Sequence, residues 1–152
     1  MSITVLAIGK KHEPWVTEGI DRYQKRLRKP FDIDFKLLPH SSREQDAARN
    51  EESAKILSAL KPSDHVILCD ERGSNISSTQ LAKKLQNQFT AGRQVTVVIG
   101  GAYGVNQELT SRADFVWSLS KLVFPHQLVR LILTEQIYRA QEINAGRPYH
   151  HE

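Results

Sequence analysis

Short apolar segments alternate with longer amphipathic segments along the whole chain, and this alternation restricts the possible folds more than any other feature. The strand-like segments lie at 2–8, 31–37, 65–69, 94–99 and 115–119. Segments with helical periodicity lie between and after them, at about 13–28, 42–60, 77–91, 106–112 and 126–144. Strands separated by helices of this length predict an α/β fold, with a mostly parallel sheet covered by helices on both faces.

The length and composition are those of one ordinary domain. We find no internal repeat or linker in the 152 residues, so we expect a single domain over 1–152. The apolar runs are too short to cross a membrane, and the first nine residues lack a basic leader. The single cysteine, Cys69, cannot form an internal disulfide and is typical of a reducing compartment. We therefore expect a cytoplasmic protein.

The formal net charge of +4 favours an anionic partner, and the positive charge is unevenly distributed. Five cations fall between Arg22 and Lys29, and Lys10 and Lys11 precede them. Two interpretations stay open. The cations complement the dipole at the C-terminus of a helix, or they form a surface that binds phosphate groups.

Several residues indicate where helices and turns should begin. Ser42-Arg43-Glu44-Gln45 has the spacing of a capping box and predicts the start of a helix. Either Ser77 or Ser78 should cap the helix that follows the 65–69 strand. Before that cap, Asp70-Glu71-Arg72-Gly73 is expected to form a polar turn.

Three loops should meet at one edge of the sheet, because parallel α/β sheets bind ligands outside the carboxyl ends of their strands. These loops are 70–73, 100–104 and 119–124. In the second loop, Gly100-Gly101-Ala102-Tyr103-Gly104 would let the backbone turn sharply and approach a ligand closely. Its spacing differs from the G-x-G-x-x-G of dinucleotide-binding sites, and no acidic residue follows about twenty positions later at the end of a next strand.

The third loop is unusual because it is apolar. The strand around Trp117 continues through Leu119-Ser120-Lys121-Leu122-Val123-Phe124 and stops at Pro125-His126. We expect this loop to be buried, and a buried loop must find partners for its backbone N–H and C=O groups. Either other loops or a ligand would provide them.

These segments together resemble one known family. The resemblance is carried by Val98–Gly104, Trp117–Arg130, Glu135–Ala140 and Pro148–His150. It extends to the opening strand that ends in Ala7-Ile8-Gly9-Lys10, and to Trp15 and Tyr23. The chain resembles the ribosomal large-subunit methyltransferase H (RlmH) family of the SPOUT superfamily over essentially its full length. The Phe-Pro-His…Arg and Tyr-Arg-Ala…Pro-Tyr-His runs are the most specific part of the resemblance.

The resemblance implies a fold and a cofactor. The fold would contain a C-terminal trefoil knot over about 65–152, which is an exception to the usual rule that chains are not knotted. The cofactor would be S-adenosyl-L-methionine, whose adenosine would share the backbone groups of the knotted loops. The residues that match the family's cofactor-binding positions are Cys69, Gly101, Leu119, Ser120, Lys121, Leu122, Val123 and Phe124. At the first of these positions the family usually has leucine, so Cys69 is a departure.

The resemblance also implies a reaction, the methylation of the N3 atom of a pseudouridine in helix 69 of 23S rRNA on the ribosome. That N–H is weakly acidic, so a base or a charge-stabilising donor should assist the step. The candidates for catalysis are Arg139, Tyr149, His150 and Glu135. Arg139 could stabilise negative charge or hold a phosphate, Tyr149 could stack on a flipped base, and His150 could position that base or accept a proton.

Simpler interpretations of the same residues stay open. His150 lies near a chain end, where residues are commonly solvated. Glu135 and Arg139 stand at i, i+4 and could form an ordinary helix ion pair. His126 could simply begin the final helix. The one cysteine and the scattered histidines do not have zinc-site spacing, so no metal is expected.

The expected partners are 23S rRNA within the ribosome and a second copy of the chain, without a membrane or a metal. A chain this small has no separate RNA-binding domain, so a homodimer could complete the substrate surface. Leu128, Leu131, Ile132 and Tyr138 are more than one sheet contact needs. Two alternatives stay open: a nucleotide-dependent enzyme that uses the Gly100–Gly104 loop, and a non-enzymatic basic RNA-binding protein associated with the ribosome.

Overall fold

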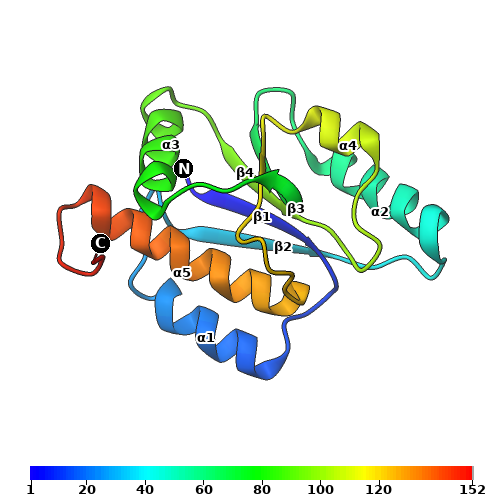
Figure 1. The fold of residues 1–152 in the computed structure, drawn as a ribbon, viewed down its shortest axis with the longest axis horizontal. Helices are drawn as coiled ribbons and strands as arrows, with labels where there is room; N and C mark the ends of the chain where they lie inside the picture. Colours follow the sequence, from blue (N-terminus) through cyan, green and yellow to red (C-terminus); the bar gives the residue numbers. More distant parts are fainter. Residues whose placement is uncertain (152) are drawn as a thin grey trace.

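The computed structural model describes residues 1–151 and contains one five-stranded sheet (Figure 1). Its strands are β1 (Ile3–Ile8), β2 (Ile33–Leu38), β3 (His65–Ser74), β4 (Val95–Ile99) and β5 (Phe115–Trp117). The strand order is β2-β1-β4-β3-β5, and every pairing between these strands is parallel. The parallel α/β architecture expected from the alternating segments is confirmed.

Five helices cover the two faces of this sheet. They are α1 (Pro14–Gln24), α2 (Gln45–Ala59), α3 (Ser78–Thr90), α4 (Gln107–Arg112) and α5 (His126–Asn144). Helices α1, α3 and α5 lie on one face, and α2 and α4 lie on the other (Figure 1).

Each face of the sheet has its own hydrophobic core. Val97 of β4 packs toward Leu133 of α5, whereas its neighbour Val98 packs toward Ile56 of α2 and Leu109 of α4. Successive side chains of a strand point to opposite faces, so a strand covered on both sides must be apolar throughout. This explains why the central strands read as continuous apolar runs.

Helix α1 is shorter than its sequence pattern predicts. It ends at Gln24 instead of continuing to Arg28. The backbone N–H of Arg28 donates to the side chain of Gln141 at 2.7 Å, and the Gln141 side chain donates in turn to the carbonyl of Arg26. The end of the helix is therefore set by α5, which the local sequence does not reveal.

The capping box expected at Ser42 does not form. Helix α2 begins after Glu44, which makes no side-chain capping bond, and Gln45 has a φ of 49°. The turn is ordered by the neighbouring Ser41, whose side chain accepts from the N–H of Arg43 and whose own N–H donates to buried Glu52. Helix α3 does have a complete capping box, which Ser77 and Gln80 form.

Strand β3 continues through the segment that the sequence marks as a polar turn. Residues 70–73 are extended, and β3 ends at Ser74. A Cβ atom at Gly73 would lie 2.4 Å from the carbonyl oxygen of Val116, so only glycine lets the strand lie this close to β5. The N–H of Ser118 donates to the carbonyl of Ser74 at 3.0 Å. Because β3 is long, its end forms one side of the region that lies beyond the carboxyl edge of the sheet.

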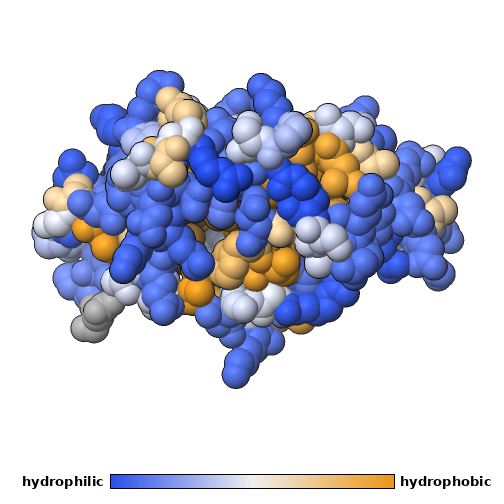
Figure 2. All heavy atoms as spheres, turned by 90° about the horizontal axis from the view of Figure 1, so that it is seen from above, coloured by the Kyte–Doolittle hydropathy of each residue, from blue (hydrophilic) through white to orange (hydrophobic). Residues whose placement is uncertain are grey.

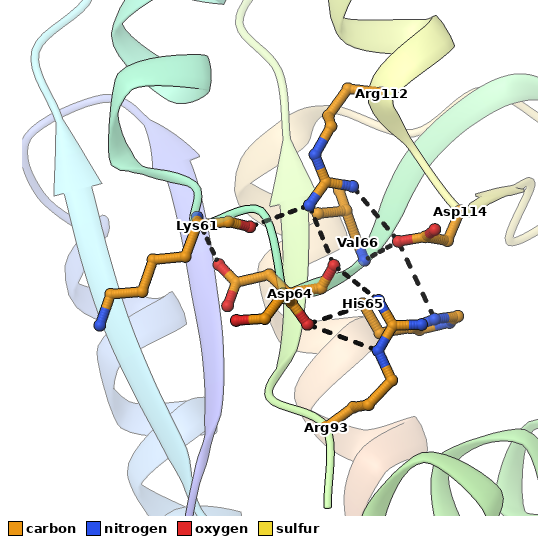
Figure 3. A network of polar contacts seen from close by, with 8 residues as sticks. Lys61, Asp64, His65, Val66, Arg93, Arg112 and Asp114 are labelled. Atoms are coloured by element: carbon orange, nitrogen blue, oxygen red, sulfur yellow. Dashed lines mark hydrogen bonds and ion pairs between the residues drawn. The ribbon is translucent and has the colours of Figure 1, made fainter. Parts of the chain in front are cut away.

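A polar network holds the opposite, amino edge of the sheet (Figure 3). Arg93 and Arg112 donate to the backbone carbonyl of Asp64 at 3.2 and 3.0 Å. The Asp114 carboxylate accepts from the N–H of Val66 at 2.8 Å and from Arg112 at 3.3 Å. These bonds join the start of β3 to the start of β5. They lie at the edge opposite the carboxyl edge, where a ligand is expected to bind.

The surface seen in Figure 2 is mostly hydrophilic, with separate apolar areas between polar residues. Among residues 1–151, no helix combines the length and apolar character needed to cross a membrane.

Candidate functional site

A pocket of about 1000 Å³ lies at the carboxyl edge of the sheet. It is lined by residues from all three loops expected there, by part of α2 and by the first turn of α5. The lining from these loops and from the ends of the strands comprises Cys69, Asp70, Glu71, Arg72, Ile99–Gln107, Trp117, Leu119, Ser120 and Leu122–His126. Three segments that are far apart in sequence therefore meet as the strand pattern predicts.

The glycine loop turns back on itself within this pocket. Gly101 and Gly104 form an isolated antiparallel bridge, and Gly104 has a φ of 75°. A Cβ atom at Gly101 would lie 2.6 Å from the Glu52 carboxylate and 3.1 Å from Ile8. At Gly104 a Cβ atom would meet nothing within 4 Å, so the tip of the loop faces open space. The base of the loop is packed while its tip is accessible to a ligand.

The apolar loop is not buried as expected, and this expectation is wrong. Leu122 and Val123 are 70% and 75% exposed at the rim of the pocket. In this exposed loop, serine side chains provide hydrogen-bond partners for backbone groups. Ser118 Oγ donates to the carbonyl of Ser120, and Ser120 Oγ accepts from the N–H of Leu122. Lys121 is exposed and is not among the residues that line the pocket.

Two neighbouring side chains on β3 give the pocket wall its electrostatic character. Burial raises the pKa of the Cys69 thiol to about 12, so this residue stays a neutral thiol. Arg72 donates to both oxygens of Asp70, and these bonds lower the pKa of that carboxyl. Next to the partly buried thiol, the wall therefore carries an ion pair.

The four residues expected to act in catalysis lie together, around the second half of α5. Glu135 accepts hydrogen bonds from Arg139 and from the Tyr149 hydroxyl, each at 2.8 Å. The Arg139 guanidinium also lies 3.0 Å from Nδ1 of His150 and 4.9 Å from the centre of the Tyr149 ring. Desolvation and the bond to Glu135 raise the pKa of Tyr149, which keeps the phenol protonated.

This cluster does not reach the pocket within one chain. None of its four residues lines the pocket, whose last lining residue on α5 is Val129. Arg139 lies ten positions further along α5, an axial distance of about 15 Å. Figure 1 shows the tail (red) at the opposite end of α5 from the 119–126 segment (yellow to orange).

The structure adds pocket residues that sequence reasoning missed. Arg49 of α2 lines the pocket, donates to the carbonyl of Tyr103 at 2.8 Å, and pairs with Asp46. Val129 of α5 also lines it, and so does His126, for which the sequence left open both a functional role and a simple helix start. Arg49 is hidden by its separation in sequence from the three loops. His126 and Val129 directly follow the third loop, and that proximity is the signal that could have found them.

An apolar groove runs between α1 and α5, outside the pocket. Leu128, Leu131 and Ile132 line it together with Gly19, Arg22, Tyr23 and Glu135. A Cβ atom at Gly19 would lie 2.7 Å from the side chain of Leu131, so glycine allows the two helices to pack closely. Tyr138 is not part of this groove. It is 6% exposed and packs between Tyr23 and Tyr149.

Within residues 1–151, no group of three histidine, cysteine, aspartate or glutamate side chains is placed to hold a metal ion.

Comparison with known proteins assigns this chain to a family. Residues 1–150 match the family model described as "Predicted SPOUT methyltransferase". Proteins named ribosomal RNA large subunit methyltransferase H are similar over nearly the full length of both chains. Those from Acetivibrio thermocellus and Dichelobacter nodosus are each 42% identical, with 99% of both chains covered. The protein from Laribacter hongkongensis is 39% identical, with 100% of both chains covered.

Solved structures agree with this assignment at the level of the fold. A methylase family protein from Neisseria gonorrhoeae aligns with a TM-score of 0.54 at 10% identity, covering 99% of this chain and 86% of that one. TrmJ from Z. mobilis ZM4 aligns with a TM-score of 0.54 at 12% identity, covering 93% and 70%. Because the family model spans nearly every residue and the relatives match from end to end, this chain belongs to the SPOUT methyltransferase family.

Proposed function

We propose that the protein is an S-adenosyl-L-methionine-dependent methyltransferase that modifies the N3 atom of a pseudouridine in helix 69 of 23S rRNA. The observation that carries this proposal is the pocket at the carboxyl edge, which is formed by the loops whose sequence resembles the family's cofactor-binding segments. Relatives named for methylation of large-subunit rRNA support the substrate class. Because ribosomes are its substrate, the protein would work in the cytoplasm.

The residues of the pocket fit a nucleoside that carries a charged chain. Ile99, Trp117 and Leu119 offer apolar surface for a purine ring, and Ser120 and Asp70 offer polar groups at its side. The volume of about 1000 Å³ is large enough for such a cofactor. When bound, the cofactor would supply an electrophilic methyl group on a sulfonium sulfur, which requires no metal.

The cluster on α5 would act on the base. Methyl transfer would form a bond from carbon to N3 and break the bond from that carbon to sulfur, while N3 would lose its proton to solvent water. Arg139 would stabilise the negative charge that spreads to the uracil oxygens as the proton leaves. Glu135 would hold Arg139 in position, and the protonated Tyr149 would pack against the base.

The position of His150 favours one of its two suggested roles. Arg139 is a permanent donor, so Nδ1 of His150 at 3.0 Å must act as the acceptor. In a neutral imidazole the other nitrogen, Nε2, then carries the proton. This tautomer suits a residue that donates to a uracil oxygen and positions the base, more than one that accepts the N3 proton.

We further propose that the active form is a homodimer in which the pocket of one subunit faces the cluster of the other. Two observations support this: the cluster does not line the pocket of its own chain, and the groove between α1 and α5 exposes Leu128, Leu131 and Ile132 beside Glu135. A second copy that covers this groove would bury its apolar lining. The C-terminal tail of each subunit would then lie near the partner's cofactor.

The proposal includes one knotted domain over 1–152, with the knot at about 65–152. Its support is the close contact between the end of β3 and the segment after β5. Gly73 touches the backbone of Val116, and the side chain of Asn75 donates to the carbonyl of Ser118 at 2.9 Å.

The test is transfer of a radiolabelled methyl group to ribosomes that lack the mark, followed by mapping of the modified nucleotide. We expect one methyl group per ribosome, at N3 of a pseudouridine in helix 69. His150→Ala should lower kcat because it removes a group that positions the base, and a normal kcat would exclude the residue from the chemistry.

Calorimetry separates the alternatives. Binding of S-adenosyl-L-methionine without binding of NADH is expected, whereas tight NADH binding would indicate a nucleotide-dependent enzyme. Salt-dependent RNA binding without any affinity for the cofactor would indicate a non-enzymatic RNA-binding protein.

A further inference from the structure

The loop between β1 and α1 carries charges and an aromatic ring that the proposed reaction does not use. Lys10 and Lys11 are exposed, and Trp15 in the first turn of α1 is 48% exposed. The indole N–H of Trp15 donates to the carboxylate of Glu13, so the ring has a fixed orientation on the surface. An indole has a large apolar area and usually packs against something. Its exposure, four residues after two exposed lysines, therefore indicates a binding surface.

A buried arginine of α5 fixes the shape of this loop. Arg130 is 0% exposed and donates to the carbonyls of Ile8, Gly9 and Lys11 at 2.9 to 3.2 Å, while Nδ1 of His12 lies 3.2 Å from it. Gly9 has a φ of 119°, and a Cβ atom there would lie 2.9 Å from the guanidinium. Burying the charged guanidinium against backbone carbonyls costs free energy. Its effect here is that the carbonyls of the loop point inward to the arginine.

The start of α5 adds a second attachment and brings the loop next to the pocket. Gln127 accepts from the N–H of Glu13 at 3.0 Å and donates to the carbonyl of Lys11 at 3.3 Å. The preceding residue, His126, lines the pocket. Ile8, at the end of β1, lies against Gly101 of the glycine loop. The β1–α1 loop and the pocket therefore share one edge of the sheet and one helix end.

We propose that residues 9–15 form an RNA contact beside the reaction site, in which Lys10 and Lys11 bind phosphates of an unpaired strand and Trp15 stacks on a base. Cations combined with an exposed aromatic ring are the combination that recognises single-stranded RNA. A protein partner would have to supply acidic groups and a flat apolar surface together, whereas an RNA loop supplies phosphates and bases in every nucleotide. This inference rests on the proposed function, because the strand is the one that carries the target nucleotide.

The first test removes the two charges. Lys10→Ala/Lys11→Ala is compared with Lys61→Ala/Lys83→Ala, a control that removes the same charge from exposed sites before β3 and on α3. Methyl transfer to ribosomes is measured at several salt concentrations. The loop variant should raise KM about tenfold and reduce the slope of log(kcat/KM) against log[salt] by about 1.4, or about 0.7 for each lost phosphate contact. Equal effects of the two double variants would overturn the proposal.

The second test concerns the indole. Trp15→Ala should raise KM for ribosomes by about tenfold, and Trp15→Phe should recover most of that loss because a phenyl ring still stacks. An unchanged KM for Trp15→Ala would contradict the stacking role. A loss seen on ribosomes but absent with an isolated helix 69 RNA would show that the loop binds a part of the ribosome outside helix 69, which also contradicts it. If wild-type protein transfers no methyl group, the proposed function itself fails; if it does and the loop variants behave as wild type, this inference alone fails.

Discussion

Arg139 contacts every other member of the cluster on α5. It pairs with Glu135, lies next to Nδ1 of His150, and covers the ring of Tyr149. Its planar guanidinium provides several donors in fixed directions, which a lysine ammonium cannot reproduce. The residue is therefore suited to hold three neighbours in place.

Replacing Arg139 with lysine should separate geometry from charge. We expect Arg139→Lys to lower kcat by about a hundredfold, since a misdirected donor stabilises the developing charge poorly. Affinity for the cofactor, measured by calorimetry, should change much less than kcat, because Arg139 is not among the residues that line the cofactor pocket. A variant with normal kcat would show that charge alone is sufficient.

Cys69 should react slowly with alkylating reagents. Its pKa of about 12 leaves little thiolate at pH 8, and the thiolate is the reactive form. We expect iodoacetamide to label the folded protein on the order of a hundredfold or more slowly than the same chain in denaturant. The rate should keep rising with pH through pH 10. A rate that levels off near pH 8.5 would contradict a raised pKa.

At the scale of single elements, two Ser-x-x-Gln sequences give different structures. Ser42 and Gln45 do not form a capping box, whereas Ser77 and Gln80 do. The difference arises from tertiary contacts, since buried Glu52 takes the N–H of Ser41 and rearranges the turn before α2. A local pattern cannot contain that information.

These two serines form a matched pair for measuring the capping energy. Ser77→Ala should destabilise the protein by about 1 kcal/mol, because one N–H at the start of α3 loses its acceptor. Ser42→Ala should change the free energy of unfolding by less than about 0.5 kcal/mol. Denaturant titration of both variants measures the difference. Equal losses would mean that the cap of α3 contributes nothing specific.

The network at the amino edge of the sheet should make stability depend on pH. Burial alone would raise the pKa of Asp114, but the N–H of Val66, His65 and Arg112 outweigh it and the pKa is lowered. The pKa of this carboxyl is lower in the folded state than in the unfolded state, where it is about 3.9. The ionised carboxylate therefore stabilises the folded protein fully at pH values above the unfolded pKa, and this contribution is lost as the pH falls through the folded pKa.

The variant Asp114→Asn tests this dependence. At pH 7 it should lower the free energy of unfolding by about 1 kcal/mol, and the difference from wild type should shrink as the pH falls below about 4. Asp46→Asn is the control, because that carboxylate is 85% exposed in its pair with Arg49 and should have little effect at any pH. A loss that stays constant from pH 7 to pH 3 would contradict the lowered pKa.

Periodicity predicted the strands and helices well where side chains face a core. It predicted them poorly where contacts between elements determine the backbone conformation. The final helix was expected at 126–144 and is His126–Asn144. Residues 70–73 were expected to turn, yet they continue β3 because Gly73 fits against the backbone of Val116. The polarity of these residues reflects an exposed strand edge, which a sequence cannot distinguish from a turn.

For the molecule as a whole, the sequence correctly predicted that the members of each of two groups of residues lie close together. It could not show how far the two groups lie from each other. Topology predicts that the three loops share an edge, and the spacing of α5 brings Arg139 close to Glu135. The distance of the cluster from the pocket depends on the direction of α5 across the sheet. That direction follows from packing against α1 and α3, which is not written in any single segment.

Heterodimers test whether each active site is divided between two subunits. Leu119→Arg is chosen to block the pocket, and Arg139→Ala removes the guanidinium of the cluster. The two variants are co-expressed with different tags, the heterodimer is purified, and methyl transfer to ribosomes is measured.

Each homodimer should be inactive, whereas the heterodimer should regain about half of the wild-type activity, because one of its two sites combines an intact pocket with an intact cluster. Far-ultraviolet circular dichroism of Leu119→Arg and of Arg139→Ala shows whether these chains fold. An inactive heterodimer made of folded chains would exclude a shared site, because it would mean that pocket and cluster must belong to the same subunit.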